Sequence, residues 1–73
     1  MYQYRATRCR IKEILKEKRM SQMELALKIN FSKQQISDIV NGRYVLGLNN
    51  AMTIAKALNV NIEDLYEWEK EEI

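Results

Sequence analysis

The chain has 73 residues with one cysteine, no histidine and no proline, and its formal net charge is +2. This length suits one small domain with a single core, and no stretch approaches the roughly 20 apolar residues of a membrane-spanning helix. One cysteine without histidine excludes an internal disulfide and supplies no zinc ligand set. We therefore expect a cytoplasmic protein without a metal or other cofactor.

Charge is distributed unevenly along the sequence. Residues 1–19 contain seven Lys or Arg against two acidic residues (+5), residues 20–58 contain four against two (+2), and residues 59–73 contain one against six (−5). A basic front and an acidic tail suit a protein that approaches nucleic acid with one side. Ordinary variation among solvated helix faces explains the same pattern equally well, so charge alone does not show that the protein binds nucleic acid.

Composition predicts a wholly helical chain, since good helix formers are abundant and proline is absent. Residues 1–7 lack a clear periodicity and form either a flexible arm or the first turn of a helix. Their tyrosines are more typical of a terminus packed on the core than of an arm on DNA. Residues 8–18 follow, with a helical apolar stripe of Ile11, Ile14 and Leu15.

A short helix is predicted over residues 22–29. Ser21 and Glu24 have the spacing of a capping box, in which each side chain bonds the other residue's backbone amide. Asn30 tolerates the left-handed backbone conformation that ends a helix. The sequence therefore predicts both ends of this helix.

A second short helix is predicted from residue 33 to about residue 41. Ser32 and Gln35 repeat the capping pattern, and Asn41 with Gly42 supplies a stop. Because only three residues separate the two helices, they must cross steeply, as in a helix-turn-helix. With Ile36 and Ile39 in the core, the outward face is polar: Lys33, Gln34, Ser37, Asp38 and Asn41.

The remaining segments predict two further helices. Tyr44, Val45 and Leu46 are unusually apolar for a loop, and either plug the core or contact a second subunit. A helix then carries an apolar face of Ala51, Ile54, Ala55 and Leu58. Asn61 caps a fifth helix, which ends as an exposed acidic tail over residues 67–73, with Trp68 as an isolated aromatic that usually needs a partner surface.

The capping, core and turn residues together resemble the Cro and phage-repressor type (XRE-like) helix-turn-helix family over about residues 8–66. The matching segments include Arg10-Ile-Lys-Glu-Ile, Met20-Ser-Gln, Glu24-Leu-Ala, Asn41-Gly-Arg43, Ile54-Ala-Lys-Ala-Leu58 and Ile62-Glu-Asp-Leu-Tyr66. The resemblance implies an all-α, compact five-helix, lambda-repressor-like domain. Residues 1–73 then form a single domain, with residues 1–7 as an N-terminal arm.

The resemblance also implies which residues bind DNA. Four residues match positions that face base edges: Lys33, Gln34, Ser37 and Asp38. Three match positions that hold the phosphate backbone: Gln22, Asn41 and Arg43. The chemistry agrees, because Lys can bind guanine, Gln can bind adenine in a bidentate pair, and Asp can accept from cytosine.

The sequence departs from the family pattern at three places. Arg19 stands where a glycine is usual at the end of the first helix, which implies backbone strain. Asn30 replaces another usual glycine but tolerates the left-handed conformation better than most residues. Leu15 and Val40 occupy the positions of an ion pair common in the family, so both partners have become apolar. We predict that these two side chains touch, because losing only one partner of a buried pair is costly.

These features predict a sequence-specific DNA-binding transcriptional regulator, a repressor that binds a two-fold operator on double-stranded DNA as a homodimer. The alternative is a protein-interaction module on the same fold, antitoxin-like or a modulator, whose protein partner binds through the C-terminal tail. No nucleophile with a base, catalytic carboxylate pair or phosphate-binding glycine loop is present, so an enzyme is not expected.

Overall fold

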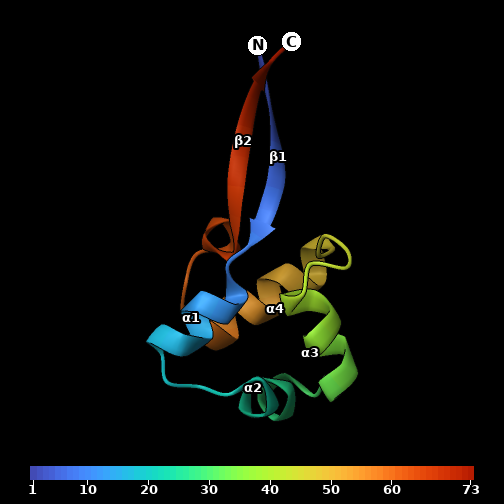
Figure 1. Cartoon of the computed structure of the whole chain (residues 1–73). Helices are drawn as coiled ribbons and strands as arrows, with labels where there is room; N and C mark the ends of the chain where they lie inside the picture. Colours follow the sequence, from blue (N-terminus) through green and yellow to red (C-terminus); the bar gives the residue numbers. More distant parts are fainter.

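A computed structural model describes residues 1–73 as a helical body from which two paired strands extend (Figure 1). The elements follow in the order β1 (Tyr2–Cys9), α1 (Ile11–Glu17), α2 (Gln22–Ile29), α3 (Lys33–Val40), α4 (Leu48–Leu58), a 3₁₀ turn η1 (Ile62–Leu65) and β2 (Tyr66–Glu72). Both chain termini lie at the far end of the strands, and the molecule measures 41 × 21 × 18 Å. No helix is both long and apolar enough to cross a membrane.

The expectation of an all-α, five-helix domain is wrong. The segment expected to be an arm or a first helical turn forms β1, and the expected end of a fifth helix forms β2. The two strands pair antiparallel in a two-stranded sheet, which we call the terminal ribbon. What remains of the fifth helix is the single turn η1, where the backbone amide of Asn61 donates to Asp64 Oδ2 at 3.0 Å.

The two faces of the ribbon differ in chemistry, because one carries the aromatic side chains and the other is polar. Residues paired directly across antiparallel strands share a face. One face contains Tyr2, Tyr4 and Ala6 opposite Glu72, Lys70 and Trp68, and the other contains Gln3 and Arg5 opposite Glu71 and Glu69. Arg5 forms ion pairs with Glu69 and Glu71 on the second face. The tyrosines therefore lie exposed on the ribbon, not packed on the core.

The helices α2 and α3 confirm their predicted ends. Ser21 with Glu24 and Ser32 with Gln35 both form complete capping boxes. Asn30 ends α2 with φ 58°. The helix α1 begins only at Ile11, later than expected, because the preceding residues are taken up by β1.

A single core of fourteen residues holds the helices together. Six large side chains in it are almost completely buried: Ile11, Leu25, Ile36, Ile39, Ile54 and Leu65. Leu15 belongs to this core and Val40 packs against it. Their direct contact stays a prediction.

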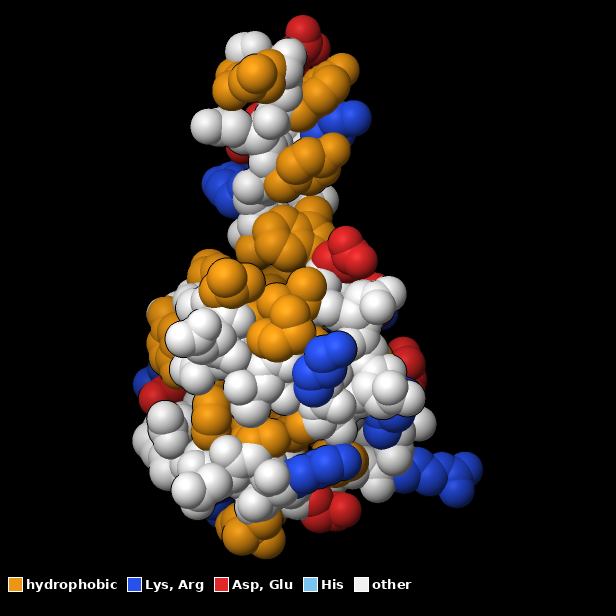
Figure 2. Space-filling view, turned by 180° about the vertical axis from the view of Figure 1, so that it is seen from behind, with side chains coloured by type: hydrophobic (Ala, Val, Ile, Leu, Met, Phe, Trp, Pro, Cys, Tyr) orange, Lys and Arg blue, Asp and Glu red, His pale blue; other side chains and the backbone are white.

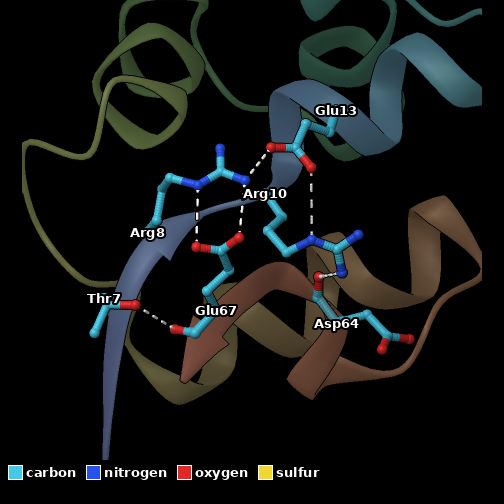
Figure 3. A network of polar contacts seen from close by, with 6 residues as sticks. All are labelled: Thr7, Arg8, Arg10, Glu13, Asp64 and Glu67. Carbon is cyan, nitrogen blue, oxygen red and sulfur yellow. Dashed lines mark hydrogen bonds and ion pairs between the residues drawn. The ribbon is translucent and has the colours of Figure 1, made fainter. Parts of the chain in front are cut away.

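The ribbon is fixed to the body by a polar network at its root (Figure 3). Arg8 on β1 binds both carboxylate oxygens of Glu67 on β2, at 3.1 and 3.0 Å, and also pairs with Glu13 of α1. Arg10 lies between Glu13 and the backbone carbonyl of Asp64, to which it donates at 3.2 Å. These contacts join the two strands to α1 and η1.

Candidate DNA-binding surface

The second helix of the helix-turn-helix, α3, has one buried face and one polar face. Ile36 and Ile39 are 0% and 1% exposed and fix the helix on the core beside α2. Since side chains three and four residues apart share a helix face, Val40 also packs toward the core, whereas the polar side chains between these positions are at least partly exposed. Four of the predicted base-facing residues lie on this outward surface: Lys33, Gln34, Ser37 and Asp38.

The carboxylate of Asp38 is the most connected group on this surface. Its Oδ1 accepts a hydrogen bond from Gln34 Nε2 at 2.9 Å and pairs with Arg43 Nε at 3.2 Å. A carboxylate facing the phosphates of DNA would be repelled if it stood alone. Here a guanidinium from the same chain compensates its charge.

The turn after α3 places Arg43 beside the helix. Gly42 has φ 70°, a backbone conformation that residues with a Cβ atom rarely adopt. The backbone amide of Gly42 then donates to the carbonyl of Ile39, and that of Arg43 donates to the carbonyl of Asp38 at 3.1 Å. These paired bonds form a Schellman motif, which directs Arg43 back along the helix.

The other two predicted phosphate-facing residues lie at helix ends. Asn41 caps the C-terminal end of α3, and its Nδ2 donates to Ser37 Oγ at 3.3 Å. Gln22 is the half-buried first residue of α2. The structure thus connects Gln34, Asp38 and Arg43 into one cluster and Asn41 with Ser37 into another, whereas Gln22 and Lys33 make no side-chain hydrogen bond within the chain.

One basic residue near this surface was not predicted from the sequence. A depression of about 380 Å³ beside the end of α3 is lined by Asn41 and Gly42 together with Arg8 and Lys12. Arg8 is already held by two carboxylates, whereas the exposed Lys12 has no ion-pair partner. Only its helical spacing was visible in the sequence, and that did not show which element its side chain approaches.

A helix-turn-helix whose second helix presents a polar outward face is the arrangement that many DNA-binding domains use. Residues 10–71 match the Cro/C1-type HTH DNA-binding domain. The chain belongs to this family, which confirms the resemblance noted in the sequence.

Relatives over most of the chain are regulators by name. An uncharacterized HTH-type transcriptional regulator of Archaeoglobus fulgidus is 35% identical over 66 residues, which cover 90% of this chain and 93% of the relative. The SPbeta prophage-derived uncharacterized HTH-type transcriptional regulator YotL of Bacillus subtilis is 34% identical over 67 residues, covering 90% and 84%. The immunity repressor protein of Bacillus phage phi105 is 38% identical over 53 residues, which cover 73% of this chain and 37% of the repressor.

Among solved structures, the restriction-modification controller protein C.AhdI from Aeromonas hydrophila has a similar fold. Its TM-score is 0.71, with 24% identity over 78% of this chain and 86% of the controller. Family and relatives together make this chain a helix-turn-helix DNA-binding transcriptional regulator, a class whose members are not enzymes.

Proposed function

We propose that the protein is a repressor that binds a two-fold symmetric operator as a homodimer and reads it with α3. The observation that carries this proposal is the outward face of α3, where hydrogen-bonding side chains occupy the family's base-facing positions on a helix fixed by Ile36 and Ile39. The immunity repressor among the relatives supports repression over activation.

Each side chain has a role that its chemistry allows. Lys33 donates to guanine O6 and N7, and Gln34 pairs with adenine N6 and N7. Ser37 bonds a neighbouring base edge, and Asp38 accepts from cytosine N4 through Oδ2, since Oδ1 is occupied. Gln22, Asn41 and Arg43 hold phosphates and position the helix.

The homodimer follows from the size of the recognition surface. A single recognition helix buries too little area for tight specific binding, so two copies on half-sites about one helical turn apart are expected. Such a two-fold interface must use the same surface on both subunits. The candidate is the apolar face of the terminal ribbon together with the part of the body beneath it.

Figure 2 shows hydrophobic side chains along the ribbon and on the part of the body beneath it. On the ribbon, Tyr4 and Trp68 are 64% and 49% exposed, and both border a depression with Glu63. On the body, Val45 and Leu48 are 63% and 75% exposed, and they line an adjoining apolar groove of about 310 Å³ that also reaches Trp68. Apolar surfaces of this kind mark protein interfaces, and DNA phosphates cannot cover them.

Charge on this face favours a second copy as the occupant. Glu63 marks the end of the ribbon face next to the body, whereas Lys70 lies toward the tip, with its Nζ 4.0 Å from the centroid of the Tyr2 ring. Two copies packed antiparallel bring Lys70 of each subunit toward the partner's Glu63. A two-stranded ribbon alone is only marginally stable in water, so burial of its apolar face against the partner stabilises it.

The proposal is tested by selecting bound sequences from a random duplex pool at physiological salt, for the wild type and Gln34→Ala. We expect an inverted repeat, with one position in each half-site relaxed by the substitution. A folded protein that selects no motif would overturn the proposal and favour the protein-interaction module.

The oligomeric state is measured separately by sedimentation equilibrium. Leu48→Lys should convert a dimer into a monomer, because it places a charge in the apolar groove. Leu27→Lys is the matched control, since Leu27 is equally exposed, at 75%, but lies on α2 outside the groove. A monomeric wild type, or a dimer that survives Leu48→Lys, would contradict the proposed interface.

A further inference from the structure

Two residues with different expected roles meet on one oxygen atom of Asp38. Gln34, expected to read a base, and Arg43, expected to hold a phosphate, both bind Oδ1, at 2.9 and 3.2 Å. The Asp38 side chain is 27% exposed and that of Arg43 is 63% exposed. Asp38 is therefore the more firmly placed partner.

The backbone dictates this arrangement. Gln34 and Asp38 are four residues apart on α3, which puts them on the same helix face. The Schellman motif brings Arg43 alongside, through its amide bond to the carbonyl of Asp38. The cluster is thus present before DNA arrives.

The carboxylate decides which way the amide of Gln34 points. A carboxylate can only accept hydrogen bonds, so the NH₂ group of Gln34 must face Asp38 and its carbonyl oxygen must face away. One N–H of Nε2 is then occupied, and the other N–H remains beside Oε1. A donor next to an acceptor is the complement of adenine N7 and N6.

The same carboxylate restrains the guanidinium of Arg43. Its Nε is occupied by Asp38, while its two terminal nitrogens remain able to bind a phosphate oxygen. The neighbouring negative charge weakens the attraction of Arg43 to any phosphate, whatever the base sequence. This reduces the sequence-independent part of DNA binding.

We propose that Asp38 is a positioning residue that sets specificity, by orienting the Gln34 amide toward an adenine and by restraining Arg43 at the phosphate backbone. This inference rests on the proposed function, because it assigns a cause to the selectivity of the same surface. It adds a role for Asp38 that does not require a base contact of its own.

The test compares affinities for the selected operator, for the same operator changed at the Gln34 base pair, and for a random duplex. Asp38→Ala should lose discrimination at that base pair by roughly 5- to 150-fold, the range of a good bidentate contact. It should also bind the random duplex more tightly. The slope of log affinity against log salt should become steeper by about one, because Arg43 gains a full phosphate contact.

Two further variants separate the effect of Asp38 on Gln34 from its effect on Arg43. Asp38→Asn keeps an oxygen that can accept from Gln34 but loses the charge that pairs with Arg43, so it should retain part of the discrimination while gaining random-duplex affinity. In the double variant Gln34→Ala with Asp38→Ala, removal of Asp38 should cost no further discrimination at that base pair. A purely structural role of Asp38 would not produce this non-additivity.

Glu17→Ala is the control for charge, because it also removes one negative charge, from an exposed position on α1. If Asp38→Ala keeps full discrimination and matches Glu17→Ala in random-duplex affinity and salt slope, the inference is overturned while the proposed function stands. If the wild type selects no motif, the proposed function itself fails, and this inference fails with it.

Discussion

The hydroxyl oxygen of Tyr66 accepts a hydrogen bond from the backbone amide of Leu46, with an N···O distance of 3.2 Å. Tyr66 begins β2, and Leu46 lies in the loop between α3 and α4. Both residues are buried. This bond therefore links the root of the terminal ribbon to the loop that carries Arg43.

Tyr66→Phe should destabilise the protein by about 1–3 kcal/mol, because it leaves the buried amide of Leu46 without an acceptor. The measurement is the free energy of unfolding from urea denaturation. Tyr44→Phe is the matched control, since Tyr44 is exposed and should tolerate the loss of its hydroxyl. Equal effects of the two changes would show that the hydrogen bond contributes nothing measurable.

Acid should weaken the root of the ribbon through Glu67. Hydrogen bonds from Arg8 hold the pKa of the Glu67 carboxyl below its ordinary value, with the charge of Arg8 adding to the effect. A depressed pKa means that the folded state binds fewer protons than the unfolded state. The stabilisation is therefore present above the unfolded pKa of about 4.3 and is lost as the pH falls through the folded pKa.

Glu67→Gln tests this dependence. Its unfolding free energy should be lower than that of the wild type at neutral pH, and should change less with pH between about pH 5 and pH 3. Glu72→Gln, at the ribbon tip and without an ion pair, should keep the wild-type pH profile. A wild-type profile in the Glu67 variant would mean that the Arg8 contact does not stabilise the fold.

Arg19→Gly should stabilise the protein. Arg19 has φ 56°, which confirms the predicted strain at the end of α1. Relief of a left-handed conformation is worth roughly 1–2 kcal/mol, and the added chain entropy of glycine offsets roughly half of it. We expect a net gain of about 0.5–1 kcal/mol in chemical denaturation.

Two controls accompany this change. Arg19→Ala removes the same charge but keeps the strain, so it should not stabilise. Lys18→Gly lies one residue earlier with φ −83°, where glycine relieves nothing, so this change should destabilise. A stabilised alanine variant would point to charge as the cause.

Lys12 borders the depression shared with Asn41, which is predicted to hold a phosphate, so we expect Lys12 to contact a phosphate as well. Lys12→Ala should therefore weaken DNA binding equally on all sequences and lower the slope of log affinity against log salt by about one. The measurement is affinity at several salt concentrations on operator and random duplexes. Lys56→Ala on α4 is the control, since its side chain borders a different depression. Equal losses in both variants would show that Lys12 acts only through net charge.

The sequence predicted the elements whose signals are local. The capping boxes of α2 and α3 involve residues three apart, and the stop at Asn30 is a property of one side chain. The strands could not be found in this way, because the partner of Tyr4 is Lys70, at the opposite end of the chain. Without that partner, a few tyrosines looked like an arm, and Trp68 among glutamates looked like a helix end.

The candidate site also contains features that local sequence patterns predict and features that depend on tertiary structure. The outward positions on α3 follow from the burial of Ile36 and Ile39, which periodicity predicts. That Asp38 is paired could not be predicted, because the pairing depends on how the turn at Gly42 returns Arg43 to the helix. The assignment of individual residues to bases and phosphates stays a prediction.

The pairing of Met1 with Ile73 at the ribbon tip, at 3.0 Å between carbonyl and amide, has a consequence for folding order. Its strands close a loop that contains the whole helical body, and closing so long a loop in an unfolded chain is entropically costly. We expect contacts of such long sequence separation to form after the local helical contacts. The aromatic face of the ribbon should then be assembled after the helices have docked, so the proposed self-association through this face should require a fully folded chain.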